Sequence, residues 1–169
     1  MTFIDLLLEE LERESARTIR ALQNVPAHKG DWKPHDRSMA FGPLVFMVAT
    51  IPSWVEMEIT LNELDIKPKG GSNFRMEPME TSEALIAGHK KAMDGVRQAL
   101  RGTTEQFLQT PWTLLSGGET VMVQPRHVMI RDTINHWMHH RGQLTVYLRL
   151  MGAQVPSLYG PSADDPRFL

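Results

Sequence analysis

The sequence predicts an all-α protein, an up-and-down four-helix bundle with long connections and a small hairpin before the last helix. Four segments carry apolar residues at helical spacing. Two connections, residues 24–40 and 65–80, contain prolines or paired glycines and lack any period. The length of 169 residues suits one domain with a buried core, so we expect residues 1–169 to form a single domain. Amphipathic helices of this kind bury their apolar faces against one another.

The first predicted helix covers residues 2–22. Thr2 and Asp5 have the spacing of a capping box, in which each side chain bonds a backbone N–H of the other residue. One stripe faces the core: Ile4, Leu7, Leu8, Leu11, Ser15, Thr18, Ile19 and Leu22.

The second predicted helix covers residues 42–63, with Pro43 in its first turn. Pro52 lies inside this helix and should kink it, because proline has no N–H and its ring clashes with the preceding turn. The expected buried stripe is Leu44, Met47, Val48, Ile51 and Val55.

The third predicted helix covers residues 82–101, begins at a Thr81 or Ser82 cap and ends at Gly102. Its inward residues are Leu85, His89, Ala92, Val96 and Leu100. The segment "WTLLSGGETVMV" that follows indicates two short strands around a Gly-Gly turn, or an ordered loop.

The fourth predicted helix covers residues 125–151. One face carries Met129, Thr133, His136, His140, Leu144, Tyr147 and Met151, whereas His139 and Arg141 point elsewhere. The tail segment "YGPSADD" is expected to fold back on the bundle, and Arg141 to bond to a loop or to this tail.

Composition narrows the classes of function. A net charge of −2 gives no electrostatic basis for binding nucleic acid or an anionic membrane. The absence of cysteine excludes disulfides, thiolate ligands and a cysteine nucleophile. The N-terminus lacks the features of a signal peptide, and no apolar run is long enough for a membrane span. We therefore expect a cytoplasmic protein without nucleic-acid or membrane partners.

His136 and His140 are the candidate metal ligands. They are one helical turn apart, so their imidazoles project side by side and could converge on one ion, such as zinc or nickel. The spacing equally fits two partly buried histidines satisfied by hydrogen bonds, or a polar seam between subunits. His89 is expected to be a core histidine bonded to a carbonyl group or water, and His28 and His35 to lie on the surface of a loop.

A longer stretch of sequence resembles a known family. The segment "NHWMHHRGQLTVYLRLMGAQVPSLYGPSADD" is similar to the C-terminal signature of the DinB family. The segments "DWKPHDRSMAFGPL" and "ATIPSW" resemble the region around that family's second helix.

This resemblance implies a bundle protein, commonly a homodimer, whose divalent metal is held by one histidine of the second helix and two of the fourth. His136 and His140 match the two on the fourth helix, but Met47 occupies the position of the third. A thioether is a poor ligand for zinc or nickel, and two ligands hold such an ion loosely.

Two functions follow from the resemblance and remain open. One is a metal-dependent hydrolase or thiol-dependent transferase that acts on a small molecule, for which the sequence assigns no general base. The other is a non-catalytic bundle with a degenerate metal site, which serves as a small-ligand binder or dimeric scaffold. Met47 favours the second.

Overall fold

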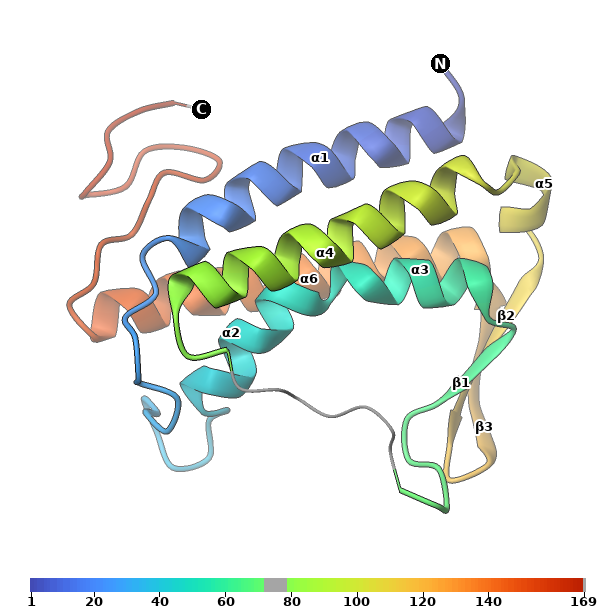
Figure 1. Ribbon diagram of the computed structural model, residues 1–169, viewed down its shortest axis with the longest axis horizontal. Coiled ribbons are helices and arrows are strands. Elements are labelled where there is room, and N and C mark those ends of the chain that lie inside the picture. The colour runs from blue at the N-terminus through green and yellow to red at the C-terminus, as the bar shows by residue number, and fades with distance from the viewer. Residues whose placement is uncertain (72–78, 169) are drawn as a thin grey trace.

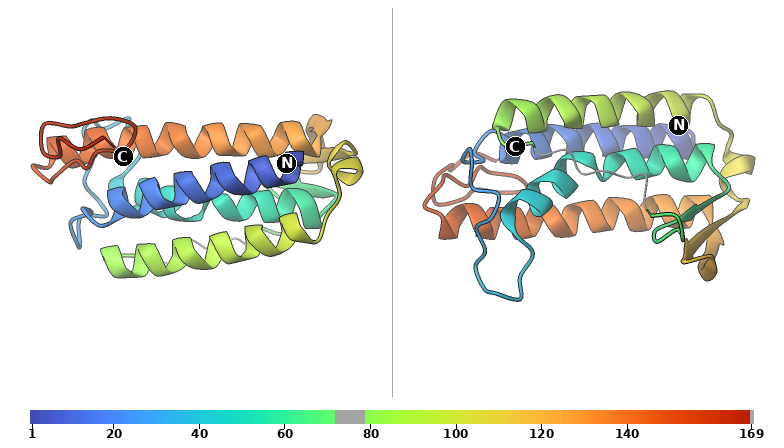
Figure 2. Two further views of the ribbon diagram at one scale, coloured as in Figure 1. Left: turned by 90° about the horizontal axis from the view of Figure 1, so that it is seen from above. Right: turned by 60° about the horizontal axis from the view of Figure 1, so that its bottom comes forward.

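The computed structural model describes residues 1–71 and 79–168, and its main body is four helical segments that lie side by side (Figures 1 and 2). Three are long single helices: α1 (Phe3–Leu22), α4 (Ser82–Arg101) and α6 (Arg126–Leu150). The fourth is bent and consists of α2 (Phe41–Thr50) and α3 (Pro52–Thr60). The predicted, mostly helical fold is confirmed, and the bounds of α1, α4 and α6 agree with the sequence to within one residue.

The bend between α2 and α3 lies at Pro52. Thr50 ends α2, Ile51 joins the two helices, and Pro52 is the first residue of α3. Proline cannot donate the backbone hydrogen bond that would continue the first helix, so the predicted kink follows from the residue itself. The helix ends earlier than residue 63, because Leu61 is extended, with φ −104° and ψ 157°.

The direction of the helices differs from the prediction. The colour gradient in Figure 1 shows that α3 and α4 run the same way along the molecule, opposite to α1 and α6. The simple up-and-down order is therefore wrong for this pair. Parallel neighbours need a long connection that returns the chain to its starting end, and residues 61–81 provide one. Part of the predicted 65–80 loop, residues 72–78, lies outside the described residues.

A three-stranded sheet lies at one end of the helices (Figure 1). The predicted hairpin is confirmed as β2 (Pro111–Ser116) paired antiparallel with β3 (Glu119–Pro125). Gly117 and Gly118 form its turn with φ of 67° and 85°, a left-handed conformation that glycine adopts readily. The third strand, β1 (Glu63–Asp65), pairs parallel with β2 and was not predicted, so the all-α class is corrected to mostly helical.

Asp65 fastens the hairpin turn to β1. Its carboxylate accepts hydrogen bonds from the backbone N–H groups of Lys67, Gly117 and Gly118, at 2.8, 2.9 and 2.7 Å. The bond from Lys67 is the main reason that the pKa of Asp65 is below its usual value. These hydrogen bonds join β1 to the hairpin turn, although Asp65 and Gly117 are 52 positions apart in the sequence.

The core follows the predicted faces closely. Leu44, Val48, Ile51 and Val55 of the bent segment are fully or almost fully buried. So are the inward residues of α4, including His89. Trp137 of α6 donates from Nε1 to the carbonyl oxygen of Val48 at 2.8 Å, which ties α6 to α2. A short helix, α5 (Glu105–Leu108), capped by Thr104, was not predicted and precedes the sheet.

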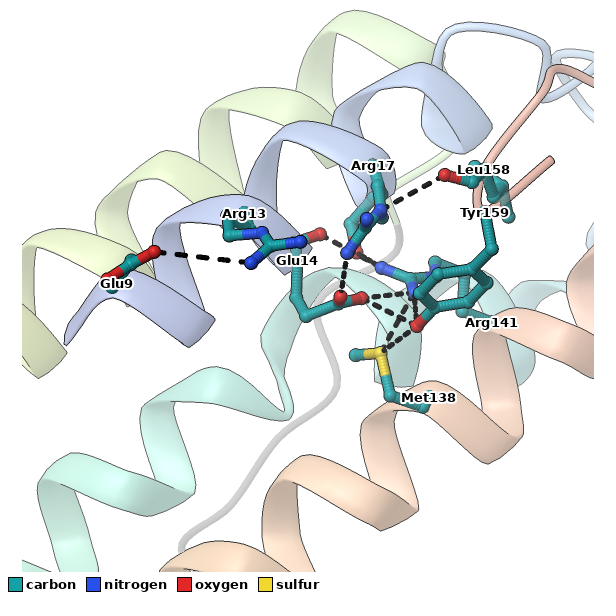
Figure 3. Close-up of polar contacts among 9 residues, drawn as sticks. Glu9, Arg13, Glu14, Arg17, Met138, Arg141, Leu158 and Tyr159 are labelled. Carbon is teal, nitrogen blue, oxygen red and sulfur yellow. Dashed lines mark hydrogen bonds and ion pairs between the residues drawn. The ribbon is translucent and has the colours of Figure 1, made fainter. Parts of the chain in front are cut away.

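The C-terminal tail folds back on the helices at the end away from the sheet, as predicted (Figures 1 and 3). Tyr159 of the tail donates from its hydroxyl to Glu14 Oε2 at 2.8 Å. Glu14 also binds the guanidinium of Arg141, and both of these side chains are 1% exposed. Arg17 donates to the carbonyl oxygen of Leu158 at 3.0 Å and lies over the Tyr159 ring. Arg141 also donates to the Tyr159 hydroxyl, so it bonds to α1 and to the tail at once, as predicted.

Within the described ranges, no helix is both long enough and apolar enough to cross a membrane.

Candidate functional site

The two candidate ligands on α6 face each other. His136 Nε2 and His140 Nε2 are 2.8 Å apart, a hydrogen-bond distance, and the ring centroids are 4.6 Å apart. His140 is buried and His136 is half-buried. The predicted inward direction of this helix face is confirmed, because Met129, Thr133 and Leu144 on the same stripe are buried too.

The hydrogen bonds around the pair define the ring protons. Gln143 Oε1 accepts a hydrogen bond from His140 Nδ1 at 2.8 Å. His140 Nδ1 therefore carries the ring proton, and His140 Nε2 is unprotonated and can accept a hydrogen bond. His136 Nε2 must then donate to His140 Nε2. The Gln143 amide nitrogen donates onward to His139 Nε2 at 3.0 Å. The result is a directed chain of hydrogen bonds along the surface of α6.

Burial lowers the pKa of both His136 and His140, and for each the neighbouring His139 lowers it further. A positive charge on one ring would also be repelled by a charge on the other. Both rings are therefore held in the neutral form at neutral pH, as the directed chain of hydrogen bonds requires.

His136 lies at the wall of a cavity of about 480 Å³ between α3, the sheet and α6. Its lining is mainly apolar, with three groups of side chains: Trp54 and Met57 from α3, Leu64, Ile66, Trp112 and Leu114 from the sheet region, and Met129 from α6. The Trp54 ring lies 5.3 Å from the His136 ring. Cavities of roughly 300–1,000 Å³ with this composition are typical of small-molecule sites.

Four polar side chains also line the cavity: Glu58, Asp132, Thr133 and His136. Glu58 is 3% exposed, and its Oε1 accepts a hydrogen bond from the Thr133 hydroxyl at 2.5 Å. Burial raises the pKa of Glu58 to about 8, the Thr133 bond opposes this shift, and the negative charge of Asp132 adds to it. At neutral pH the Glu58 carboxyl is therefore mostly protonated.

A family model decides the relationship of this chain to known proteins. The model for the DinB family matches residues 1–167. The chain belongs to the DinB family. The family membership that the histidine helix and the tail segment indicated is therefore confirmed, and the match extends over almost the whole chain.

Individual relatives agree with this assignment. Over 92 residues the chain is 34% identical to the uncharacterized protein YrdA of Bacillus subtilis (strain 168). The alignment covers 52% of this chain and 51% of YrdA, so the chain spans about half the length of that curated relative.

Two crystal structures of DinB-like proteins share the fold. The one from Bacillus cereus ATCC 10987 has a TM-score of 0.68 and 20% identity, covering 90% of this chain and 95% of that one. The second, YjoA from Bacillus subtilis, has a TM-score of 0.67 and 19% identity, covering 90% and 97%. At these identities the likeness establishes the fold alone.

The donor set of this DinB chain does not fit the three-histidine centre that the resemblance implies. Met47 of α2 packs against the hydrophobic cluster that contains Ile134 and Trp137, on either side of His136 along α6. In residues 1–71 and 79–168, no three His, Asp or Glu side chains are grouped so that they could hold a metal ion. The histidine pair offers two nitrogens, and one of them carries the proton shared between the rings.

The other histidines have structural or surface positions. His89 is fully buried, its Nδ1 donates to the Ala49 carbonyl at 3.1 Å, and its Nε2 accepts from Ser15 at 2.8 Å. The prediction of a core histidine bonded to a carbonyl group is confirmed. His28 and His35 are exposed in the loop before α2, as predicted, and His127 bonds to the carbonyl oxygen of Leu108.

Sequence reasoning missed Glu58 as part of the site. The sequence places it near the end of a predicted helix, where a carboxylate is usually exposed. Glu58 is buried where α3 packs on α6, beside a cavity that residues of the sheet also line. Thr133 gave the one available signal, since a polar residue on an inward stripe needs a buried partner.

Proposed function

We propose that this DinB protein binds a small, largely apolar molecule in the cavity between α3, the sheet and α6, on a four-helix-bundle scaffold. The cavity itself carries the proposal. It combines two tryptophan rings with aliphatic and methionine side chains, and it has a few polar groups that could orient a ligand, among them Thr133 and His136. Methionine side chains such as Met57 and Met129 adapt easily to the shape of a bound molecule.

The histidine pair acts in this proposal as a polar wall. Hydrogen bonds link His136 Nε2 to His140 and His140 to Gln143, and the ring of His136 lies beside Trp54. A rigid ring at the wall helps to orient a ligand because its position is set before binding.

The metal-dependent hydrolase or transferase fits the described residues less well. Such chemistry uses a metal with three protein ligands and an open position, and two histidines with a thioether in place of the third do not supply it. The degenerate-site alternative, a small-ligand binder, is therefore the function that the geometry supports best.

Calorimetric titration with a neutral aromatic probe, phenylpropanol, tests the binding site. We expect one site per chain, with an affinity in the millimolar range or better, that is lost when Leu114→Trp fills the cavity. Val121→Trp is the matched control, because Val121 lies on the same sheet, is 54% exposed and is not part of the cavity wall. Circular dichroism should show that both variants are folded. No binding by the parent, or equal binding by Leu114→Trp, would contradict the proposal.

A homodimer is the assembly that the family resemblance implies, and we propose it for this chain, in the cytoplasm as the composition of the sequence favours. Sedimentation equilibrium at micromolar concentration should give twice the mass of the 169-residue chain. A single species of monomer mass would refute the dimer and leave the cavity proposal untouched, since the cavity is lined within one chain.

A further inference from the structure

Glu58, which lines the cavity, has one carboxyl oxygen without a hydrogen-bond partner among the described residues. Its Oε1 accepts the hydrogen bond from Thr133, but its Oε2 has no hydrogen-bond partner in the described part of the chain. Both oxygens belong to a side chain that is 97% buried, since only 3% is exposed. A buried polar atom without a partner is costly in a native protein and calls for an explanation. A ligand that supplies the missing partner is one explanation.

The cavity lining contains acidic side chains and no cationic ones among the described residues. Asp132, one turn before His136 on α6, lines the same cavity as Glu58. No lysine or arginine of residues 1–71 and 79–168 lines it, and none of them forms an ion pair with Asp132 within 4 Å. While Glu58 is protonated, the carboxylate of Asp132 is the charged group of the lining, so the potential beside it is negative and favours a cation over an anion.

Aromatic rings complete the lining. Trp54 and Trp112 line the cavity from two different elements, α3 and β2. The face of an indole ring attracts an organic cation, more strongly where water is excluded. Trp112 is 2% exposed, and its Nε1–H also lacks a partner among the described residues. An oxygen atom of a ligand would satisfy that donor.

We infer that the cavity takes an organic amine, a primary or secondary ammonium group on an aromatic or aliphatic body, with the ammonium bound to Glu58 Oε2. The inference rests on the proposed ligand binding and names its chemical class. The ammonium N–H donates to Oε2, and the body packs between the tryptophan rings. Glu58 gives its proton to solvent when the amine binds, so the buried pair in the complex consists of one cation and one carboxylate.

A titration with three probes of equal shape tests the class of ligand. Phenylpropylamine, phenylpropanol and phenylpropanoate differ only in the group that would reach Glu58. At neutral pH we expect the amine to bind the full chain about tenfold or more tightly than the alcohol, since a hydrogen bond to a charged group is the stronger kind. The carboxylate should bind most weakly. Amine binding should also release a proton, seen as a binding enthalpy that changes with the ionisation enthalpy of the buffer.

Two variants separate the role of Glu58 from general binding. Glu58→Gln keeps the acceptor for Thr133 but cannot become an anion, so the amine should lose its preference and its proton release while the alcohol binds as before. Glu56→Gln is the matched control, because Glu56 is on the same helix but lies at a different cavity, beside Gly95. This control should bind all three probes like the parent.

The outcomes distinguish this inference from the proposed function. If the alcohol binds and the amine binds no better, the cavity is a neutral-ligand site and the amine inference is wrong. If the amine preference persists in Glu58→Gln, another group binds the ammonium and the inference is also wrong. If no probe binds, the proposed function itself fails.

Discussion

Thr133 of α6 donates its hydroxyl hydrogen to Glu58 of α3 across 2.5 Å, inside the wall of the cavity. This bond joins two helices that contact each other extensively, and it uses only one of the two carboxyl oxygens of Glu58. The other oxygen is screened from water, so ionisation would place a poorly solvated charge beside Asp132. Glu58, which we propose as the group that binds the ligand, therefore lowers the stability of the ligand-free protein at high pH.

Glu58→Gln should stabilise the protein at neutral and alkaline pH. The folded pKa of about 8 lies above the ordinary value of 4.5, so the folded state binds the Glu58 proton more tightly than the unfolded state. Stability due to this group is fully present below about pH 4.5, falls as pH rises, and levels off above about pH 8. Glutamine removes this loss, on the order of 3 kcal/mol at pH 7. Urea unfolding at several pH values measures the difference between variant and parent.

Glu56→Gln serves as the control for that experiment, since Glu56 lies outside this cavity. Its unfolding free energy should follow the parent at every pH. A difference between Glu58→Gln and the parent that stayed constant from pH 4.5 to pH 8 would show that Glu58 does not titrate in this range.

His89 should make the protein sensitive to acid. Burial lowers the pKa of His89 from 6.5 to about 4, with the hydrogen bond to Ala49 opposing the shift. The unfolded state takes up the proton below about pH 6.5 and the folded state only near pH 4, so stability should fall as pH drops through this window. The loss is at most about 3 kcal/mol for a shift of this size.

His89→Leu isolates this contribution from that of the carboxylates. The variant should be less stable at neutral pH, because Ser15 and the Ala49 carbonyl lose their partner. Its unfolding free energy should nevertheless change less than the parent's between pH 6.5 and pH 4. An equally steep fall in the variant would mean that other groups cause the acid sensitivity.

The buried ion pair of Glu14 and Arg141 should be sensitive to loss of one partner. Burial alone would raise the pKa of Glu14, but hydrogen bonds from Arg141 and Tyr159 outweigh it, so the pKa is lowered and Glu14 stays ionised. Arg141→Met leaves this charge buried without its main partner, which should cost about 3–5 kcal/mol. Thermal unfolding measures the loss.

A second substitution tests the cause of that loss. Adding Glu14→Gln to Arg141→Met removes the uncompensated charge, so the double variant should be more stable than Arg141→Met alone. Tyr159→Phe removes the hydroxyl that donates to Glu14 and accepts from Arg141, and should cost about 1–2 kcal/mol. If the double variant were no better than the single one, packing of the Arg141 side chain would explain the loss instead.

The sequence predicted what repeats with the helical period and missed what depends on distant contacts. The inward positions of Thr133, His136 and His140 follow from a period of 3.6 residues, and the kink at Pro52 follows from one missing N–H. No local rule indicates that α3 and α4 run parallel or that residues 63–65 pair with β2, because such pairing is decided by packing between remote segments.

The same limit applies to the polar groups. Glu14 and Arg141 belong to charged residue types that usually face water, yet each is buried because the other neutralises it across the helix interface. Glu58 also depends on remote segments, since it accepts a hydrogen bond from Thr133 of α6 and shares its cavity with residues of the sheet. The histidine pair was found from the sequence because both of its members are on one helix.

Met47→His should give the histidine pair a third donor. Met47 packs against the hydrophobic cluster that includes Ile134 and Trp137, neighbours of His136 along α6, and the DinB resemblance aligns this position with a histidine. A third imidazole supplies the nitrogen that a thioether lacks, so zinc or nickel should bind the variant about tenfold or more tightly than the parent. Competition against a chromogenic chelator, with protein that has no histidine tag, measures the affinity. Adding His140→Ala to Met47→His should abolish the gain, which shows that the pair is involved. A folded Met47→His variant with the parent's affinity would mean that position 47 does not face the pair, and a parent that retained stoichiometric metal through dialysis would show that two histidines suffice.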